Sequence, residues 1–258
     1  MTNDVEAALS RRAILKSAIA VAAGGIVYGC APRAIETAAR PAAPIPLPPI
    51  AQPVFQPEPP RPAVPLGVRP ALFENAMAAL ERHGDRVLYK DRIAIADFAW
   101  PSSQRRFHVV DLKTNQAQTM LVAHGMGSDP DHTGYLLRFS NDPGSNATSE
   151  GCFLAADYYI GVHGQSQRLY GLDPTNSNAL DRAIVIHSAA YANPEMIAQF
   201  GKLGRSQGCF AVGDADLYRV FESLGQGRMV YAAKVGAPAG WRPRHFPFRA
   251  STMIGEAL

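Results

Sequence analysis

Residues 204–210, GRSQGCF, fit the motifs of two enzyme classes that have different folds. The stretch matches the G-x-S-x-G pattern of serine hydrolases, with Ser206 in the middle. It also contains Cys209, one of only three cysteines in the chain. The candidate nucleophile is therefore either the Ser206 hydroxyl or the Cys209 thiol, and the surrounding sequence has to distinguish them.

The sequence around Ser206 does not suit a serine hydrolase. In that class the serine follows a buried parallel strand, and the acid and the histidine come later in the chain. Upstream, residues 194–202, PEMIAQFGK, have the spacing of a helix. Downstream, the only histidine is His245, which lies in a tail rich in Pro and Arg. We therefore reject Ser206 as the nucleophile.

The folded part is predicted to be a β-dominated α+β domain. Residues 71–83 have apolar positions at helical spacing, and Gly84 follows as a stop signal. A second helix is expected at 216–224, with Asp214 or Asp216 as its cap. Short β-rich runs occupy 87–89, 93–98, 107–112, 118–123, 158–162, 167–172, 183–187 and 229–235, and a polar turn at 113–116 predicts a hairpin. Many short strands with few helices argue against a doubly wound α/β sheet.

Composition divides the chain into three parts. Residues 41–70 contain 12 prolines, which disfavour packed secondary structure and favour an extended tether. We assign 31–70 as a linker and 71–258 as the folded domain.

A formal net charge of +3 is too small to indicate a nucleic-acid partner.

Residues 1–30 are predicted to be an export signal. The basic stretch 10–16, SRRAILK, precedes 13 uncharged residues, which are too few to span a membrane. The paired arginines are typical of twin-arginine (Tat) export, and an ordinary membrane anchor or a Sec signal is the alternative. Cys30 ends a VYGC sequence similar to a lipoprotein processing box, and cleavage a little further on is the alternative. We expect a periplasmic protein, with membrane anchoring as a lipoprotein left open.

A histidine at the end of a strand favours the cysteine as nucleophile. The apolar run 183–186 ends at His187-Ser188, and a rigidly held imidazole makes a nearby thiolate accessible. Cys209 follows Gly208, whose missing side chain would let a substrate carbonyl approach. The backbone N–H groups of Gly208 and Cys209 could then form an oxyanion hole.

These residues resemble the catalytic domain of L,D-transpeptidases of the YkuD type, in a divergent branch. The family shows H-[GS], a loop and then [ST]-x-G-C, which this chain matches with His187-Ser188 and with SQGC at 206–209. The resemblance covers about 124–233 and includes 139–141, 149–151, 159–164, 178–182 and 204–206. It implies a β-sandwich domain, a Cys209 nucleophile, a His187 base and peptidoglycan stem peptides as substrate, without a cofactor.

Two departures from the family pattern affect the substrate contacts. Gln207 stands where the family has His, and Ala211 stands where it has Arg or Asn. The 18 residues between His187 and Ser206 slightly exceed the common spacing. The expected transferase reaction is 3–3 cross-linking. An L,D-carboxypeptidase, an L,D-endopeptidase and a non-catalytic wall-binding domain remain alternatives.

Further residues are assigned to the substrate site. Arg205 and Ser206 directly precede the Gly-Cys pair, and Arg205 is placed to bind a stem-peptide carboxylate. His163, in a Y-x-G-x-H-G stretch, is expected to line the site. His124, His132, Asp129 and Asp131 share one loop, but no His-x-x-x-His or Cys-x-x-Cys spacing supports a metal, and none is predicted.

Cys152 lies in SEGCF at 149–153, a near-copy of the end of the Cys209 motif. By the resemblance, this segment aligns with a glycine-containing turn in front of a strand, where no cysteine is required. Cys152 is therefore expected to be a core residue. A Cys152–Cys209 disulfide is the alternative, because an exported chain meets an oxidising compartment.

Overall fold

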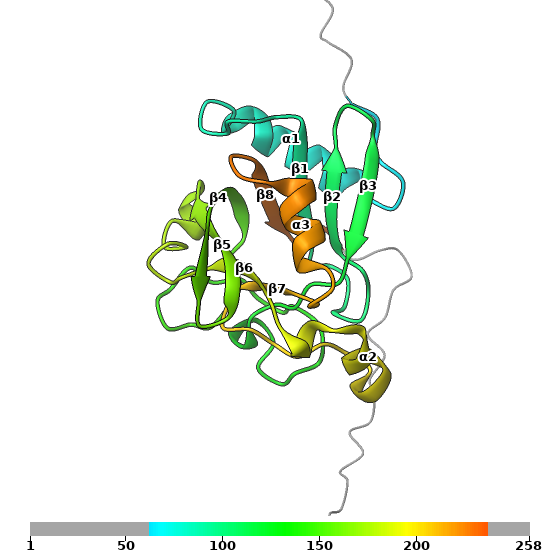
Figure 1. Ribbon diagram of the computed structural model, residues 1–258, viewed down its shortest axis with the longest axis vertical. Coiled ribbons are helices and arrows are strands. Elements are labelled where there is room, and N and C mark those ends of the chain that lie inside the picture. The colour runs from blue at the N-terminus through cyan, green and yellow to red at the C-terminus, as the bar shows by residue number, and fades with distance from the viewer. Residues whose placement is uncertain (1–61, 237–258) are drawn as a thin grey trace, which may run out of the picture. The chain divides into compact units, whose positions relative to one another are not determined.

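The computed structural model describes residues 62–236, which form one eight-stranded sheet with three α-helices (Figure 1). The elements are α1 (Pro70–Arg82), β1 (Arg92–Asp97), β2 (Phe107–Asp111), β3 (Gln116–Met120), β4 (Gly151–Gly161), β5 (Gly164–Gly171), β6 (Val185–Ser188), α2 (Pro194–Phe200), β7 (Phe210–Val212), α3 (Leu217–Leu224) and β8 (Met229–Ala233). The predicted β-dominated α+β class is confirmed.

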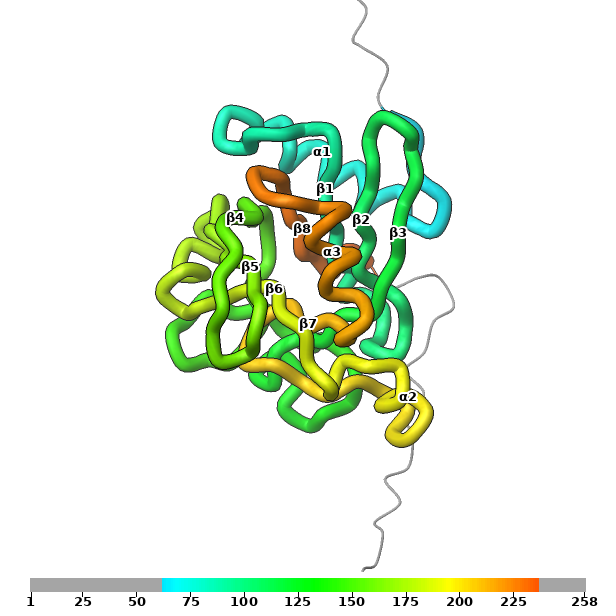
Figure 2. The backbone as a smooth tube through the Cα atoms, in the orientation of Figure 1, coloured from blue at the N-terminus to red at the C-terminus, as the bar shows by residue number. Residues whose placement is uncertain are grey.

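The strands are ordered β3-β2-β1-β8-β4-β5-β6-β7. The pairs β1–β8 and β6–β7 are parallel, and the other neighbours are antiparallel. Figure 2 shows the β2–β3 and β4–β5 hairpins on either side of β1 and β8. The predicted turn at 113–116 joins β2 to β3, and its Asn115 has a positive φ of 58°, which asparagine tolerates in turns.

Alternating side chains give the sheet two apolar faces. One face packs against α3 through residues such as Phe107, Phe153 and Phe210. The other face packs against α1 through residues such as Ile93 and Met229. Each helix contributes its own buried apolar residues, namely Leu72, Phe73, Ala76, Ala79 and Leu80 from α1 and Leu217, Val220 and Leu224 from α3.

The sheet curls until its two ends meet. Phe210 on β7 stands against Phe107 on β2, with 6.4 Å between the ring centroids, although the two strands are far apart in the sheet order. Beyond β3, the Ala123 N–H donates to the Ala211 carbonyl at 2.8 Å. The two halves of the sheet therefore pack face to face, which gives the predicted sandwich-like core.

Three local predictions were wrong. Residues 87–89 form no strand, because Val87 N–H donates back to the His83 carbonyl and continues the turn after α1. Cys152 lies within β4 rather than in a turn before a strand. Asp216 occupies the N-cap position of α3 but makes no side-chain capping bond, whereas Asp214 accepts a hydrogen bond from Asn193.

Several predictions concern residues outside 62–236. These are the export signal at 1–30, the lipoprotein box at Cys30, most of the proline-rich linker and the tail that contains His245. Within the described range, no helix is both long and apolar enough to cross a membrane.

Candidate functional site

The parallel pair β6–β7 brings His187 close to the segment that contains Cys209. His187 is paired with Ala211, and Cys209 precedes Ala211 by two residues. Cys209 lies in the bend directly before β7, next to the strand that pairs with His187. Both residues are buried, with 1% of His187 and 9% of Cys209 exposed.

The His187 ring is held by its neighbour in the chain. Its Nδ1 lies 2.8 Å from the Ser188 carbonyl oxygen, which can only accept, so Nδ1 carries the proton and Nε2 keeps its lone pair. Burial lowers the pKa of His187 below its ordinary value, which favours the neutral ring. Ser188 therefore acts on the site through its backbone carbonyl.

His163 stacks on the same imidazole. It lies in the turn between β4 and β5, and its ring is 4.3 Å from that of His187, with 18° between the planes. The charge of His163 contributes to the lowered pKa of His187. The structure thus places His163 directly against the predicted base.

The Cys209 thiol faces backbone groups of the 182–185 segment. Its Sγ donates to the Ala183 carbonyl at 3.5 Å. Burial raises the pKa of the thiol, and a hydrogen bond from the Val185 backbone and the charge of Arg182 oppose that effect. The resting state is therefore a neutral thiol. Tyr191 also faces this sulfur, and burial together with the Cys209 charge raises the pKa of Tyr191 to about 12.

The Ser206 hydroxyl is used inside the turn that precedes Cys209. It donates to the Cys209 carbonyl at 2.7 Å and accepts from the Gly208 N–H at 3.1 Å, and only 4% of the residue is exposed. This geometry supports the rejection of Ser206 as a nucleophile. It also differs from the predicted substrate-binding role for Ser206, and it occupies one of the two N–H groups expected to form the oxyanion hole.

Gly208 is required for a reason other than substrate access. Its φ of +117° is a conformation that side-chain-bearing residues rarely adopt, and a Cβ there would lie 2.7 Å from the Ala147 carbonyl and 2.8 Å from Ile184 Cδ1. Glycine is therefore required at position 208 because neighbouring atoms leave no room for a side chain, and not because a substrate carbonyl needs an open path.

We expect Gly208→Ala to lower activity at least tenfold and to lower the melting temperature, because the added methyl group moves Cys209 relative to His187. The measurement is thermal unfolding by circular dichroism together with turnover. Gly144→Ala is the matched control, since Gly144 also has a positive φ, +74°, but nothing lies within 4 Å of its Cβ position. An unaffected Gly208→Ala enzyme would contradict this role.

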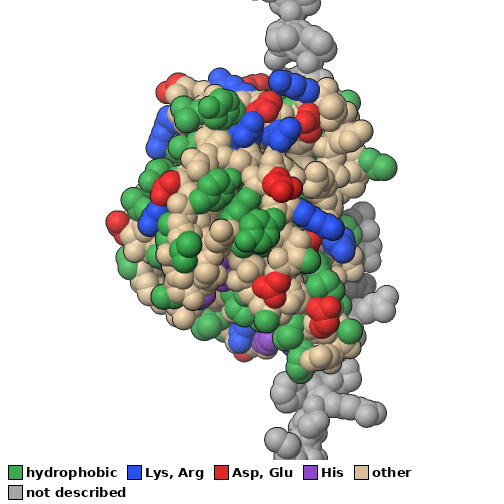
Figure 3. All heavy atoms as spheres, viewed as in Figure 1, with side chains coloured by type: hydrophobic (Ala, Val, Ile, Leu, Met, Phe, Trp, Pro, Cys, Tyr) green, Lys and Arg blue, Asp and Glu red, His purple; other side chains and the backbone are tan. Residues whose placement is uncertain are grey.

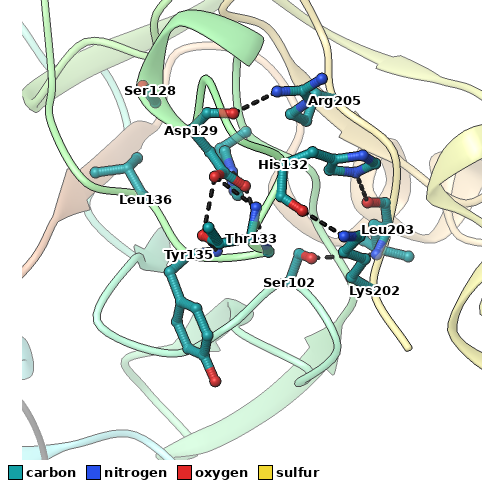
Figure 4. Close-up of polar contacts among 12 residues, drawn as sticks. Ser102, Ser128, Asp129, His132, Thr133, Tyr135, Leu136, Lys202, Leu203 and Arg205 are labelled. Carbon is teal, nitrogen blue, oxygen red and sulfur yellow. Dashed lines mark hydrogen bonds and ion pairs between the residues drawn. The ribbon is translucent and has the colours of Figure 1, made fainter. Parts of the chain in front are cut away.

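The loop before the Cys209 turn is anchored to the 129–134 segment (Figure 4). Arg205 Nη1 donates to the carbonyls of Asp129 and Pro130, at 2.9 Å for Pro130. The Leu203 carbonyl accepts from His132 Nε2 at 2.9 Å, and Lys202 Nζ donates to the His132 carbonyl. Nη1 of Arg205 is therefore occupied by backbone carbonyls. This differs from the predicted role, in which the Arg205 side chain is free to bind a carboxylate of the stem peptide.

His124 and Asp129, considered above as metal ligands, contact each other instead. Arg106 Nη2 donates to His124 Nδ1 at 2.7 Å, so the opposite nitrogen carries the proton and faces Asp129 Oδ2 at 3.3 Å. Burial lowers the pKa of His124 to about 4. Among residues 62–236, no group of three or more His, Cys, Asp or Glu side chains could hold a metal ion.

Cys152 is separate from this arrangement. It is fully buried in the cluster that packs against α1, and burial raises the pKa of its thiol to about 12. Both Cys152 and Cys209 are free thiols. The alternative of a Cys152–Cys209 disulfide is therefore wrong for this structure, and the predicted core role of Cys152 is what the packing shows.

An open cavity of about 410 Å³ lies elsewhere on the domain, between the β4–β5 hairpin and α3. It is lined by Tyr158, Tyr159, Ile160, Gln165, Phe221 and Glu222. Figure 3 shows hydrophobic side chains gathered in the middle of this face, with charged side chains around them. Neither His187 nor Cys209 lines the cavity, so its size does not mark the site described above.

The family model of the L,D-transpeptidase catalytic domain matches residues 66–233. The chain therefore belongs to the family of L,D-transpeptidase catalytic domains. This confirms the resemblance stated from the sequence and the predicted enzyme class. The match also begins close to α1, so the helix and the β2–β3 hairpin belong to the family domain rather than to an addition in front of it.

Solved structures to which the chain is similar include three L,D-transpeptidases. One from Mycobacterium tuberculosis is 14% identical with a TM-score of 0.36, covering 56% of this chain and 58% of that one. One from Mycobacterium smegmatis is 13% identical with a TM-score of 0.33, covering 55% and 58%. One from Xylanimonas cellulosilytica is 15% identical with a TM-score of 0.33, covering 62% and 69%. The chain thus spans about three fifths of the first two. No curated protein matches the chain.

Two residues near the thiol were not identified as site residues from the sequence. Tyr191 follows β6 in a short 3-10 turn, and no sequence signal singles it out. Arg182 lies in the 178–182 segment that carries part of the family resemblance, but the acceptors of its guanidinium are distant in the chain and are identified only in the folded structure. Its guanidinium reaches three acceptors around the Cys209 turn.

Proposed function

We propose that this protein is a peptidoglycan L,D-transpeptidase in which Cys209 is the nucleophile and His187 is the general base. The observation that carries the proposal is the pairing of His187 with Ala211, two residues after Cys209, with His187 Nδ1–H bound to the Ser188 carbonyl. That hydrogen bond leaves Nε2 as the nitrogen able to take a proton. Membership of the L,D-transpeptidase family supports the substrate class.

The pair works from its neutral form. Burial lowers the pKa of His187 and raises the pKa of Cys209, so at neutral pH both groups are uncharged. A thiolate–imidazolium pair would be costly in this buried setting. Proton transfer from Sγ to Nε2 therefore accompanies attack on the substrate instead of preceding it, which is general-base catalysis.

In the first half-reaction, Cys209 Sγ attacks the carbonyl carbon of the third, L-centred residue of a tetrapeptide stem. His187 Nε2 takes the thiol proton as the S–C bond forms. The C–N bond to the terminal D-alanine then breaks, and His187 returns the proton to the leaving amine. The products are a thioester on Cys209 and free D-alanine.

In the second half-reaction, an acceptor attacks the thioester carbonyl. A side-chain amine of a neighbouring stem loses a proton to His187 and forms a new amide, and the thiol leaves with that proton. The product is a 3–3 cross-link. With water as acceptor the product is a tripeptide, and the reaction is that of an L,D-carboxypeptidase.

The developing oxyanion has fewer preformed donors than the sequence suggested. The Gly208 N–H donates to Ser206 Oγ, so of the two predicted donors we retain only the Cys209 N–H. A single backbone donor stabilises less charge than a pair does.

We also propose that the reaction takes place outside the cytoplasm. The support is the SRRAILK stretch at 10–16 and the uncharged run at 17–29, which fit a twin-arginine signal. Anchoring through Cys30 would add a membrane tether. Mass spectrometry of the N-terminal peptide from the exported protein would distinguish cleavage, lipidation and retention of residues 1–30.

The test of the proposed function is incubation of the purified full-length chain with disaccharide tetrapeptides, followed by mass spectrometry of products and protein. We expect loss of D-alanine, formation of a 3–3 cross-linked dimer and a transient adduct on the peptide that contains Cys209. A tripeptide as the only product would assign the carboxypeptidase reaction. Unchanged substrate, with Cys209 reduced, would contradict catalysis and favour a wall-binding domain.

A further inference from the structure

Arg182 lies beneath the turn that carries Cys209 and holds the surrounding loops together. Its Nη1 donates to the Ser140 carbonyl at 2.8 Å and to Ser149 Oγ at 2.6 Å. Its Nη2 donates to the Ala147 carbonyl. A planar guanidinium is suited to such a divergent set of acceptors, which a lysine could not satisfy together.

The same guanidinium approaches the backbone of the Cys209 turn. The position that a Cβ on Gly208 would occupy lies 3.2 Å from Arg182 Nη2 and 2.7 Å from the Ala147 carbonyl oxygen. The next residue in the chain, Ala183, has a φ of 52° and turns its carbonyl toward Cys209 Sγ. Thus Ala183 contacts the Cys209 thiol through its carbonyl, and Arg182 lies next to the backbone of the Cys209 turn.

The Arg182 charge is not neutralised by an ion pair. Its hydrogen-bond acceptors are two carbonyls and a hydroxyl, and within residues 62–236 no carboxylate lies within ion-pair distance of it. Its electrostatic neighbours are Cys209 and the more exposed Asp142. An uncompensated, partly buried cation next to a thiol favours the thiolate.

We propose that Arg182 is a positioning residue that fixes the Gly208–Cys209 turn and keeps a positive charge beside the Cys209 sulfur. This inference rests on the proposed function, because it assigns Arg182 to the same nucleophile. Within residues 62–236, the other ionisable group that interacts electrostatically with Cys209 is Tyr191, and the proposed base is His187; both are neutral near pH 7.

The test is the pH dependence of iodoacetamide alkylation at Cys209, measured by peptide mass spectrometry on the full-length chain without substrate. In Arg182→Gln we expect the midpoint of the profile to move to higher pH and the alkylation rate at pH 7 to fall about tenfold. Arg205→Gln is the matched control. Its guanidinium also binds backbone carbonyls, but Arg205 is not among the charges that act on the Cys209 thiol, so its midpoint should stay at the wild-type value.

Arg182→Lys separates charge from hydrogen bonding. It keeps the positive charge and loses part of the acceptor set, so we expect a lower melting temperature with an unchanged midpoint. Unchanged midpoints in both Arg182 variants, with native near-UV dichroism, would overturn the electrostatic role. If Arg182→Gln does not fold, Arg182→Lys decides, and a raised midpoint in it would overturn the proposal.

This experiment is independent of the proposed reaction. Alkylation needs no peptidoglycan, so a shifted midpoint in Arg182→Gln supports the inference even if the chain proves to be a carboxypeptidase. Conversely, turnover that survives loss of the Cys209 sulfur would overturn the proposed function, whatever the alkylation profile shows.

Discussion

Replacing Cys209 by alanine is expected to abolish turnover, by about 10⁴-fold or more, and to remove the covalent adduct. The thiol is the group that forms the thioester, and the neighbouring Ser206 hydroxyl cannot substitute for it because it is bound to the Cys209 carbonyl and the Gly208 N–H. The measurement is the yield of D-alanine and of 3–3 cross-linked dimer, with intact-protein mass spectrometry for the adduct.

Cys152→Ala is the matched control, because it removes the other thiol of the described domain. Cys152 is fully buried against α1, so its truncation leaves a small cavity and should cost about 1–3 kcal/mol of the free energy of unfolding. Turnover at 25 °C should remain close to wild type. Lost turnover in a natively folded Cys152→Ala protein, or retained turnover in Cys209→Ala, would show that the nucleophile is misassigned.

Local patterns predicted most of the fold. The spacing of apolar residues indicated α1 and α3, and the polar run at 113–116 indicated the β2–β3 hairpin. These signals are local, because helix periodicity and turn chemistry are contained within about ten residues. In contrast, β7 has only three residues, and its strand character comes from parallel pairing with β6. A sequence pattern of three residues cannot predict this pairing.

The site was predictable only where the motif itself carries the chemistry. His187 and Cys209 were predicted from the family spacing, and β6–β7 pairing places His187 opposite Ala211, two residues after Cys209. The assignments for Arg205 and Ser206 assumed that polar side chains beside the motif are free for substrate. Arg205 binds carbonyls about 75 positions earlier in the chain, a partner that sequence proximity cannot reveal. Arg182 was overlooked for the same reason, since its acceptors are 33 to 42 positions away.

His187→Ala is expected to lower turnover by about 10³–10⁴-fold, because within residues 62–236 neither Arg182 nor Tyr191, the ionisable groups that interact with Cys209, is both neutral and basic near pH 7. Arg182 stays protonated, and burial raises the pKa of Tyr191 to about 12. Ser188→Ala is the matched control. It keeps the backbone carbonyl that accepts from His187 Nδ1, so its turnover should remain within a few-fold of wild type.

The pH profile gives a second, independent readout of the same histidine. Burial lowers the pKa of His187 below its ordinary value of 6.5, so the neutral base persists as the pH falls past 6.5. The acid limb of kcat against pH should therefore lie below pH 6.5, and it should vanish from the residual activity of His187→Ala. Loss of activity already above pH 6.5, or an unchanged acid limb in His187→Ala, would mean that a different group takes the thiol proton. His163, whose ring stacks on His187, is the first residue to replace in that case.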